Sequence, residues 1–285
     1  MADRSIAAAL FVFGLLVGSF FNVVIARVPA GLSIVRPGSR CPRCGHALAW
    51  YENIPLVSWL VLRGRCRSCR APISGRYPLI ELLTGALFGA CAVRFPPGWE
   101  LVRAVLLVGF LIPLAFIDLE HWVLPFQLTL PGAAVGLLSA VPLGGDALVE
   151  AAIGAAVGFV FFLGLEVALR VLLKKEALGA GDKWLMLLVG VFLGWRPLFG
   201  VLLLSNVQGA VVGGLLLLAR GRAGPAPPPP GAPATEDGWA PGATHVPFGP
   251  FIALAAVELL LLSDWAVRTF PGPFTGLLTG LPWGA

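Results

Sequence analysis

Long apolar stretches recur along this chain, separated by short polar or charged segments. A helix needs about 20 mostly apolar residues to cross the hydrocarbon of a bilayer. We expect eight membrane helices, at residues 6–26, 79–95, 101–117, 126–143, 148–173, 183–195, 198–219 and 248–267. The sequence therefore predicts an all-α polytopic membrane protein with about eight transmembrane helices.

Composition agrees with this fold class. Of the 285 residues, 58% are hydrophobic and 12% are charged, whereas soluble domains carry roughly 25% charged residues. Such a chain cannot solvate its own surface in water. This excludes an ordinary cytosolic enzyme, a disordered regulator and a secreted disulfide scaffold.

The predicted sixth span, 183–195, is shorter than the others and is bounded by Gly181, Gly194 and Pro197. Interrupted segments of this kind often lie near the working site of a membrane protein. A plain short or re-entrant helix is the alternative. The sequence leaves open whether this segment crosses the bilayer.

Lysine and arginine placement indicates the orientation. If the spans alternate, fifteen of the 20 Lys and Arg residues fall on one side of the membrane. Positive loops stay in the cytoplasm, so we expect both termini outside and the first span retained as a membrane helix. The net charge of +5 then reflects topology, and we expect no nucleic-acid partner.

These features divide the chain into five parts. We expect a first transmembrane helix (1–26), a cytoplasmic loop (27–77), a transmembrane core (78–219), a flexible proline-rich cytoplasmic loop (220–247), and a last transmembrane helix with a C-terminal tail (248–285).

The first loop contains a cysteine tetrad with the spacing of a metal site. Cys41 and Cys44 form one C-x2-C pair, and Cys66 and Cys69 form a second after a 21-residue spacer. Two such pairs can surround one zinc ion tetrahedrally. Two disulfides are the alternative, but disulfides are rare in the reducing cytoplasm. We expect structural zinc, because a closed four-cysteine shell leaves no position for a reacting water.

Two aspartates stand at the predicted cytoplasmic edge of the bilayer. Asp118 ends the third span and Asp182 opens the sixth. Two carboxylates that meet in a low dielectric share a proton, so one acts as acid and the other as base, as in aspartic proteases. The alternative is that Asp182 only caps a helix and Asp118 only flanks one.

Three glutamates lie within or near apolar spans, where a carboxylate is costly and a functional role is the default expectation. They are Glu81, Glu166 and Glu258. For Glu166 and Glu258 we favour protonated or paired structural groups.

Several ordered motifs resemble those of the type IV prepilin peptidases, leader peptidases that also N-methylate. These are GSFFNV (18–23) with Arg27-Val28-Pro29, Asn53-Ile54-Pro55, SWL (58–60), RGRC (63–66), PIS (72–74), RYP (76–78) with Glu81-Leu82, GAGDK (179–183) and PFGPF (247–251). The four-cysteine loop matches as well. One position departs from the family, which usually has an aspartate where Phe126 follows Leu124-Pro125.

The resemblance implies an inner-membrane aspartic endopeptidase with its active site at the cytoplasmic face. Its substrates would be prepilins and pseudopilins with short basic leaders, whose apolar helix lies in the membrane lipid. Asp118 and Asp182 match the two catalytic aspartates of the family, within the core at 78–219.

Bifunctional members of the family then methylate the new N-terminus with S-adenosyl-L-methionine. For methyl transfer we single out the loop at 41–69, Gly64 and Glu81. Two alternatives stay open: a peptidase without methyl transfer, and a proton-coupled transporter or scaffold with a zinc-stapled loop.

Overall fold

The computed structural model describes residues 4–173, 179, 181–220 and 246–269. Most of the predicted proline-rich loop (220–247) and the C-terminal tail after residue 269 lie outside the described residues. The described chain is helical, and its only β pairing is two isolated bridges, Arg40–Ala47 and Arg65–Pro72. The elements run in the order α1 (Arg4–Arg27), η1 (Trp50–Asn53), α2 (Val57–Val61), α3 (Arg76–Arg94), α4 (Trp99–His121), α5 (Phe126–Leu138), η2 (Val141–Leu143), α6 (Gly145–Leu173), α7 (Asp182–Leu193), α8 (Pro197–Arg220) and α9 (Gly249–Thr269).

Six of the described helices are long and apolar enough to cross a membrane. They are α1, α3, α4, α5 with its continuation η2, α6 and α8, and they match six of the eight predicted spans. The protein is therefore a multi-pass membrane protein. The predicted eighth span corresponds to α9, which has 21 residues.

The predicted sixth span corresponds to α7, which has 12 residues between Gly181 and Gly194. Such a helix is about 18 Å long, whereas the hydrocarbon layer is about 30 Å thick. Helix α7 cannot cross the bilayer by itself. The predicted sixth span is therefore a short helix.

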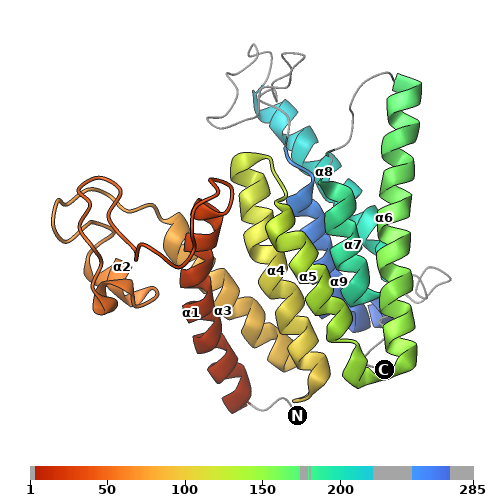
Figure 1. The fold of residues 1–285 in the computed structure, drawn as a ribbon, viewed down its shortest axis with the longest axis horizontal. Helices are drawn as coiled ribbons and strands as arrows, with labels where there is room; N and C mark the ends of the chain where they lie inside the picture. The colour runs from red at the N-terminus through yellow and green to blue at the C-terminus, as the bar shows by residue number, and fades with distance from the viewer. Residues whose placement is uncertain (1–3, 174–178, 180, 221–245, 270–285) are drawn as a thin grey trace. The chain divides into compact units, whose positions relative to one another are not determined.

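The chain forms two compact units, Met1–Pro113 and Leu114–Ala285, which divide within α4. In the first unit α1 and α3 lie side by side, and the loop that carries α2 joins them (Figure 1). Glycines allow this close approach. A Cβ atom at Gly14 would lie 2.8 Å from the Cα of Gly85, and one at Gly18 would lie 2.7 Å from the Cα of Glu81. Small residues at helix interfaces serve this purpose in membranes, where backbones must approach closely for van der Waals packing.

The second unit is organised around α7. Nine of its twelve residues are buried, and α5, α6 and α9 pack against it. Gly154 and Gly190 face each other across α6 and α7 so closely that a Cβ on either would overlap the backbone carbonyl of the other. On the other side, a Cβ at Gly136 of α5 would lie 2.6 Å from the Val191 side chain. These contacts set the position of α7, and with it Asp182 at its first residue.

Candidate active site and metal centre

The four loop cysteines converge in the first unit, as the spacing predicted. Their sulfur atoms all lie within 4.8 Å of one another. The Sγ atoms of Cys41 and Cys69 are 3.8 Å apart, and those of Cys44 and Cys66 are 3.9 Å apart. Four sulfurs bound at about 2.3 Å around one zinc would lie about 3.8 Å from each other. All four cysteines are free of disulfides, so the tetrad fits zinc and the disulfide alternative is wrong.

Each cysteine pair sits in a tight turn closed by backbone hydrogen bonds. The N–H of Cys41 donates to the His46 carbonyl at 2.9 Å, and the N–H of Cys66 donates to the Ala71 carbonyl at 2.8 Å. Both turns need a left-handed residue, which is Gly45 in the first (φ 72°) and Arg70 in the second (φ 59°). The backbone N–H groups of Cys44 and Arg43 hydrogen-bond to Cys41 and lower the pKa of its thiol to about 6. Because zinc binds the thiolate, the turn prepares this ligand.

His46 is not a fifth ligand. Its Nε2 lies 3.1 Å from Oε2 of Glu52, which also accepts a hydrogen bond from the Ala49 N–H at 2.9 Å. Both interactions lower the pKa of the Glu52 carboxyl, and the hydrogen bond from the Ala49 N–H has the larger effect. His46 lies outside the group of described residues that could hold a metal ion, and its contact with Glu52 ties η1 to the first cysteine turn.

A cavity of about 640 Å³ lies between this loop and the ends of α1 and α3. Cys41 and Cys66 line it together with Asn22, Trp59 and Glu81. The Glu81 carboxylate is buried, accepts a hydrogen bond from the Leu56 N–H at 2.8 Å and is hydrogen-bonded to Ser19. Leu56 has a left-handed backbone (φ 59°), so Glu81 holds a strained turn of the loop against α3.

Gly64 does not line this cavity. A Cβ at Gly64 would lie 2.9 Å from the Trp59 ring, whose Nε1 donates to the Ile73 carbonyl at 3.3 Å. Gly64 thus leaves room for the indole that forms part of the cavity wall. Glu81 therefore lines the cavity itself, whereas Gly64 contacts it only through the Trp59 ring.

In the second unit, Asp118 lies in the last turn of α4 and is 6% exposed. Its Oδ2 accepts a hydrogen bond from the Gly249 N–H, at the first residue of α9, with a distance of 3.0 Å. A Cβ atom at Gly249 would collide with this carboxylate. The first residue of α9 is therefore a glycine because the Asp118 carboxylate occupies the space of a side chain.

Asp182 is the first residue of α7 and is 5% exposed. Its carboxylate interacts electrostatically with that of Asp118 and is hydrogen-bonded to the Gly179 backbone. The two chain segments meet through Leu124, because a Cβ at Gly181 would lie 2.7 Å from the Leu124 Cβ. The structure thus places Asp118 and Asp182 close enough for their charges to interact, and Gly181 of the GAGD motif is needed for the close contact with Leu124.

Phe126, which departs from the family pattern, packs in this region. Its ring lies edge-on to that of Trp184 with centroids 5.3 Å apart, and Phe159 of α6 contacts the same indole at 4.7 Å. The position therefore takes part in an aromatic contact between α5 and α7.

Glu166 and Glu258, for which we favoured a structural role, both have polar partners. Glu166 contacts Lys183 at 2.6 Å and Arg170 at 3.2 Å, and Glu258 accepts a hydrogen bond from Gln208 at 2.6 Å. The Lys183 contact joins α6 to the residue after Asp182, so Glu166 supports the start of α7.

The role of Gly249 was not predicted from the sequence, although this residue belongs to the PFGPF motif (247–251). The available signal was a glycine between Phe248 and Pro250 at the start of an apolar span. Only tertiary structure shows the carboxylate that its N–H contacts, because 131 residues separate the two partners.

A multi-pass membrane protein with a four-cysteine cluster and a pair of buried aspartates belongs to a narrow class. Residues 12–95 match the bacterial peptidase A24 N-terminal domain, and residues 105–214 match the type IV leader peptidase family. A protein of Myxococcus xanthus named prepilin leader peptidase/N-methyltransferase is 52% identical, over 97% of this chain and 96% of its own length.

Proteins of the same name from Aeromonas hydrophila and Pseudomonas aeruginosa are 40% and 35% identical, over 91% and 90% of this chain and 92% and 90% of their own lengths. No solved structure matches the chain significantly. The chain belongs to the type IV leader peptidase family. This membership confirms the prediction of a membrane enzyme with leader peptidase and N-methyltransferase activity.

We expect the purified full-length protein to contain one zinc ion per chain, measured by plasma mass spectrometry. Cys44→Ser removes one thiolate ligand and should lower the zinc content to less than about a tenth, because three remaining ligands bind the ion far more weakly. Cys91→Ser is the matched control, since Cys91 is buried in α3, away from the tetrad. Wild-type protein without zinc, or a Cys44→Ser variant with full zinc content, would contradict this assignment.

Proposed function

We propose that Asp118 and Asp182 cleave the leader from prepilins and pseudopilins. The observation that carries this proposal is that both carboxylates are buried in the same unit and lie close enough for their charges to interact. One carboxylate takes a proton from the attacking water, and the other, protonated, gives a proton to the leaving amine. The acid and base roles then reverse before the next cycle.

The charge distribution supports the location of this reaction at the cytoplasmic face of the inner membrane. A substrate with a short basic leader and an apolar helix would keep its leader in the cytosol and its helix in the lipid. Its scissile bond would then lie at the boundary. Asp118 stands at the end of α4 and Asp182 at the start of α7, so both carboxylates lie at helix ends, where an extended peptide can reach them.

The Gly249 N–H positions the base. A hydrogen bond to Oδ2 of Asp118 fixes the rotamer of this carboxylate and leaves Oδ1 to contact water. Orientation of this kind contributes strongly to catalysis, because a displacement of about 1 Å can cost about 10²-fold in rate.

Methyl transfer we assign to the first unit, with S-adenosyl-L-methionine bound in the cavity of about 640 Å³. This volume is within the range of roughly 300–1,000 Å³ for small-molecule sites. Glu81 lines it and is a buried acceptor, while Gly64 acts through the Trp59 wall. The zinc would be structural, since its ligands Cys41 and Cys66 form part of the same wall. When bound, the cofactor supplies an electrophilic methyl group on a sulfonium.

Asp118→Asn and Asp182→Asn should each reduce cleavage of a prepilin by about 10²–10⁴-fold, because each removes a proton-transfer group. Cleavage is measured by the mass of the processed pilin. Asp146→Asn, at an exposed position of α6, should keep wild-type activity. An unchanged melting temperature in detergent shows that the variants are folded, and full cleavage by either folded variant would end the proposal.

Gly249→Ala should lower kcat for cleavage by about 10²-fold, because its methyl group displaces the Asp118 carboxylate, and should leave KM within about twofold. Gly213→Ala is the control, since a Cβ there meets open space. A fall in kcat together with a large rise in KM in the Gly249 variant would instead indicate general misfolding of the second unit.

Glu81→Gln should reduce N-methylation of the cleaved pilin by about 10²-fold or more, through loss of a proton acceptor. Cleavage should be unaffected. Glutamine still offers an acceptor to the Leu56 N–H, so the strained turn is kept. Methylation is read as 14 Da per N-terminus on a pre-cleaved peptide, with Glu100→Gln of α4 as control. Wild-type methylation by Glu81→Gln would remove this residue from the site.

A further inference from the structure

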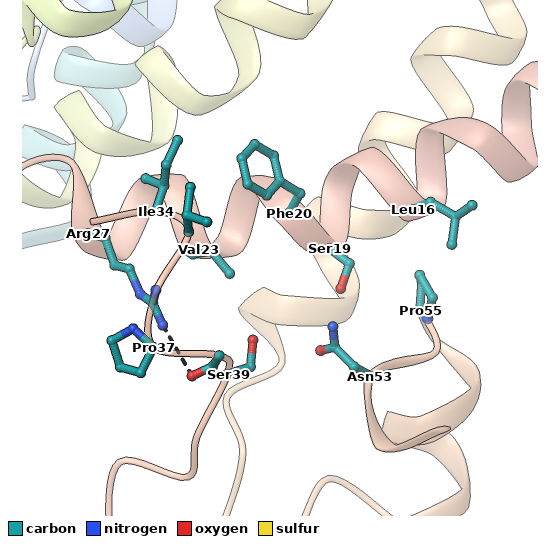
Figure 2. A pocket seen from close by; sticks show the side chains of 12 residues that line it. Leu16, Ser19, Phe20, Val23, Arg27, Ile34, Pro37, Ser39, Asn53 and Pro55 are labelled. Carbon is teal, nitrogen blue, oxygen red and sulfur yellow. Dashed lines mark hydrogen bonds between the residues drawn. The ribbon is translucent and has the colours of Figure 1, made fainter. Parts of the chain in front are cut away.

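A second cavity, of about 290 Å³, lies along α1 in the first unit (Figure 2). Residues of α1, of the segment 34–39 and of the segment 53–55 line it. Five residues line both this cavity and the larger one: Ser19, Val23, Arg27, Ser39 and Asn53. The two spaces therefore adjoin, and groups bound in them can meet at the shared wall.

We propose that the smaller cavity is the methyl-acceptor subsite. It binds the first residue of the cleaved pilin, with the apolar side chain inside and the N-terminal amine at Ser19 and Asn53. The methyl donor occupies the adjoining larger cavity, and amine and methyl group meet where Ser19 and Asn53 border both spaces. This inference rests on the proposed methyl transfer and adds where, and by which chemistry, the acceptor is recognised.

The lining of the smaller cavity suits a molecule with an apolar body and one polar end. Most of its side chains are apolar: Leu16, Phe20, Val23, Ile34, Val35, Pro37 and Pro55. The polar side chains of Ser19 and Asn53 stand at the wall shared with the larger cavity, and Figure 2 shows them pointing toward each other. The resemblance to the leader peptidase family implies a processed pilin that begins with phenylalanine or a similar apolar residue, and such a residue has this same division.

The size of the cavity also favours part of a ligand over a whole cofactor. Its volume of about 290 Å³ is at the lower limit for small-molecule sites, roughly 300 Å³. One apolar side chain with its amine fits this space, and the rest of the pilin helix must lie outside it. Leu16 and Phe20 of α1 are 57% and 46% exposed, which provides an apolar surface where that helix can continue.

Arg27 keeps the cavity formed in the absence of substrate. Its Nη1 donates to the Ser33 carbonyl at 3.0 Å, and its Nη2 donates to the Gly38 carbonyl at 3.4 Å, the dashed contact in Figure 2. Both bonds tie the segment that carries Ile34 and Pro37 to the end of α1. A preformed wall reduces the ordering cost of binding.

Methyl transfer to the pilin amine would take place where the two cavities adjoin. The neutral amine nitrogen attacks the methyl carbon, so an N–C bond forms and the C–S bond of the sulfonium breaks. The sulfur keeps the electron pair and becomes neutral. The amine loses one proton to the Ser19 hydroxyl oxygen, and the Ser19 proton moves to the Glu81 carboxylate, to which Ser19 is hydrogen-bonded.

The test fills the smaller cavity without changing the larger one. Gly38 lines only the smaller cavity, and a Cβ there meets no atom within 4 Å. In the full-length protein, Gly38→Phe should raise KM for a pre-cleaved pilin peptide beginning with Phe by about tenfold or more. The Kd for S-adenosyl-L-methionine, measured by calorimetry, should stay within about twofold. Gly75→Phe is the matched control, because Gly75 also faces open space and lines neither cavity.

A second readout is the choice of first residue. The wild type should methylate a peptide beginning with Phe about tenfold or more faster than one beginning with Ala, and Gly38→Phe should lose this preference. If Gly38→Phe does not retain its zinc, Ile34→Trp fills the same cavity in its place.

Three results would overturn the inference. The first is wild-type KM and preference in the folded Gly38→Phe variant. The second is loss of donor binding with unchanged peptide KM, which would make this cavity part of the donor site. The third is loss of a co-purified phospholipid with unchanged methylation, which would assign the cavity to lipid. A wild-type protein that binds no S-adenosyl-L-methionine would instead refute the proposed methyl transfer itself.

Discussion

Two buried carboxylates in one helical unit are the constraint on which the rest of this structure depends. A charged group in apolar surroundings is costly unless polar groups offset the loss of water. Here backbone groups at helix starts provide the offset, from Gly249 to Asp118 and from Gly179 to Asp182. Glycine is required at position 249 because the Asp118 carboxylate lies where a Cβ would be. Membrane helices must also pack by close backbone contact, so the same residue type shapes the site and the α6–α7 interface at Gly154 and Gly190.

The two sites proposed for the family's activities lie in different units of this chain. The aspartates lie wholly in the unit after Pro113, whereas the cysteine tetrad and both cavities lie in the unit before it. In the first unit the loop is held to the membrane helices by few but specific contacts, such as that of Glu81 with the Leu56 N–H. A metal cluster suits such a loop, because a loop with so small an apolar core needs another source of stability.

The departure at Phe126 illustrates how one position can change its physical role while its surroundings are kept. Where the family usually has a carboxylate, this chain has an aromatic ring packed on Trp184. The Asp118 and Asp182 carboxylates keep their own backbone partners, Gly249 and Gly179. The geometry of the aspartate pair therefore does not require a third acid at this place.

The sequence by itself determined the membrane class and the four-cysteine metal site, and it singled out Asp118 and Asp182 as candidates for a catalytic pair. Hydropathy over about 20 residues and the C-x2-C spacing are local patterns, which a chain carries regardless of its tertiary contacts. Only the tertiary structure decided that α7 is buried against α5, α6 and α9, that Gly249 holds Asp118, and that two cavities share a wall at Ser19 and Asn53. Each of these depends on segments far apart in the chain, and periodicity within one segment contains no information about the partner that will pack against it.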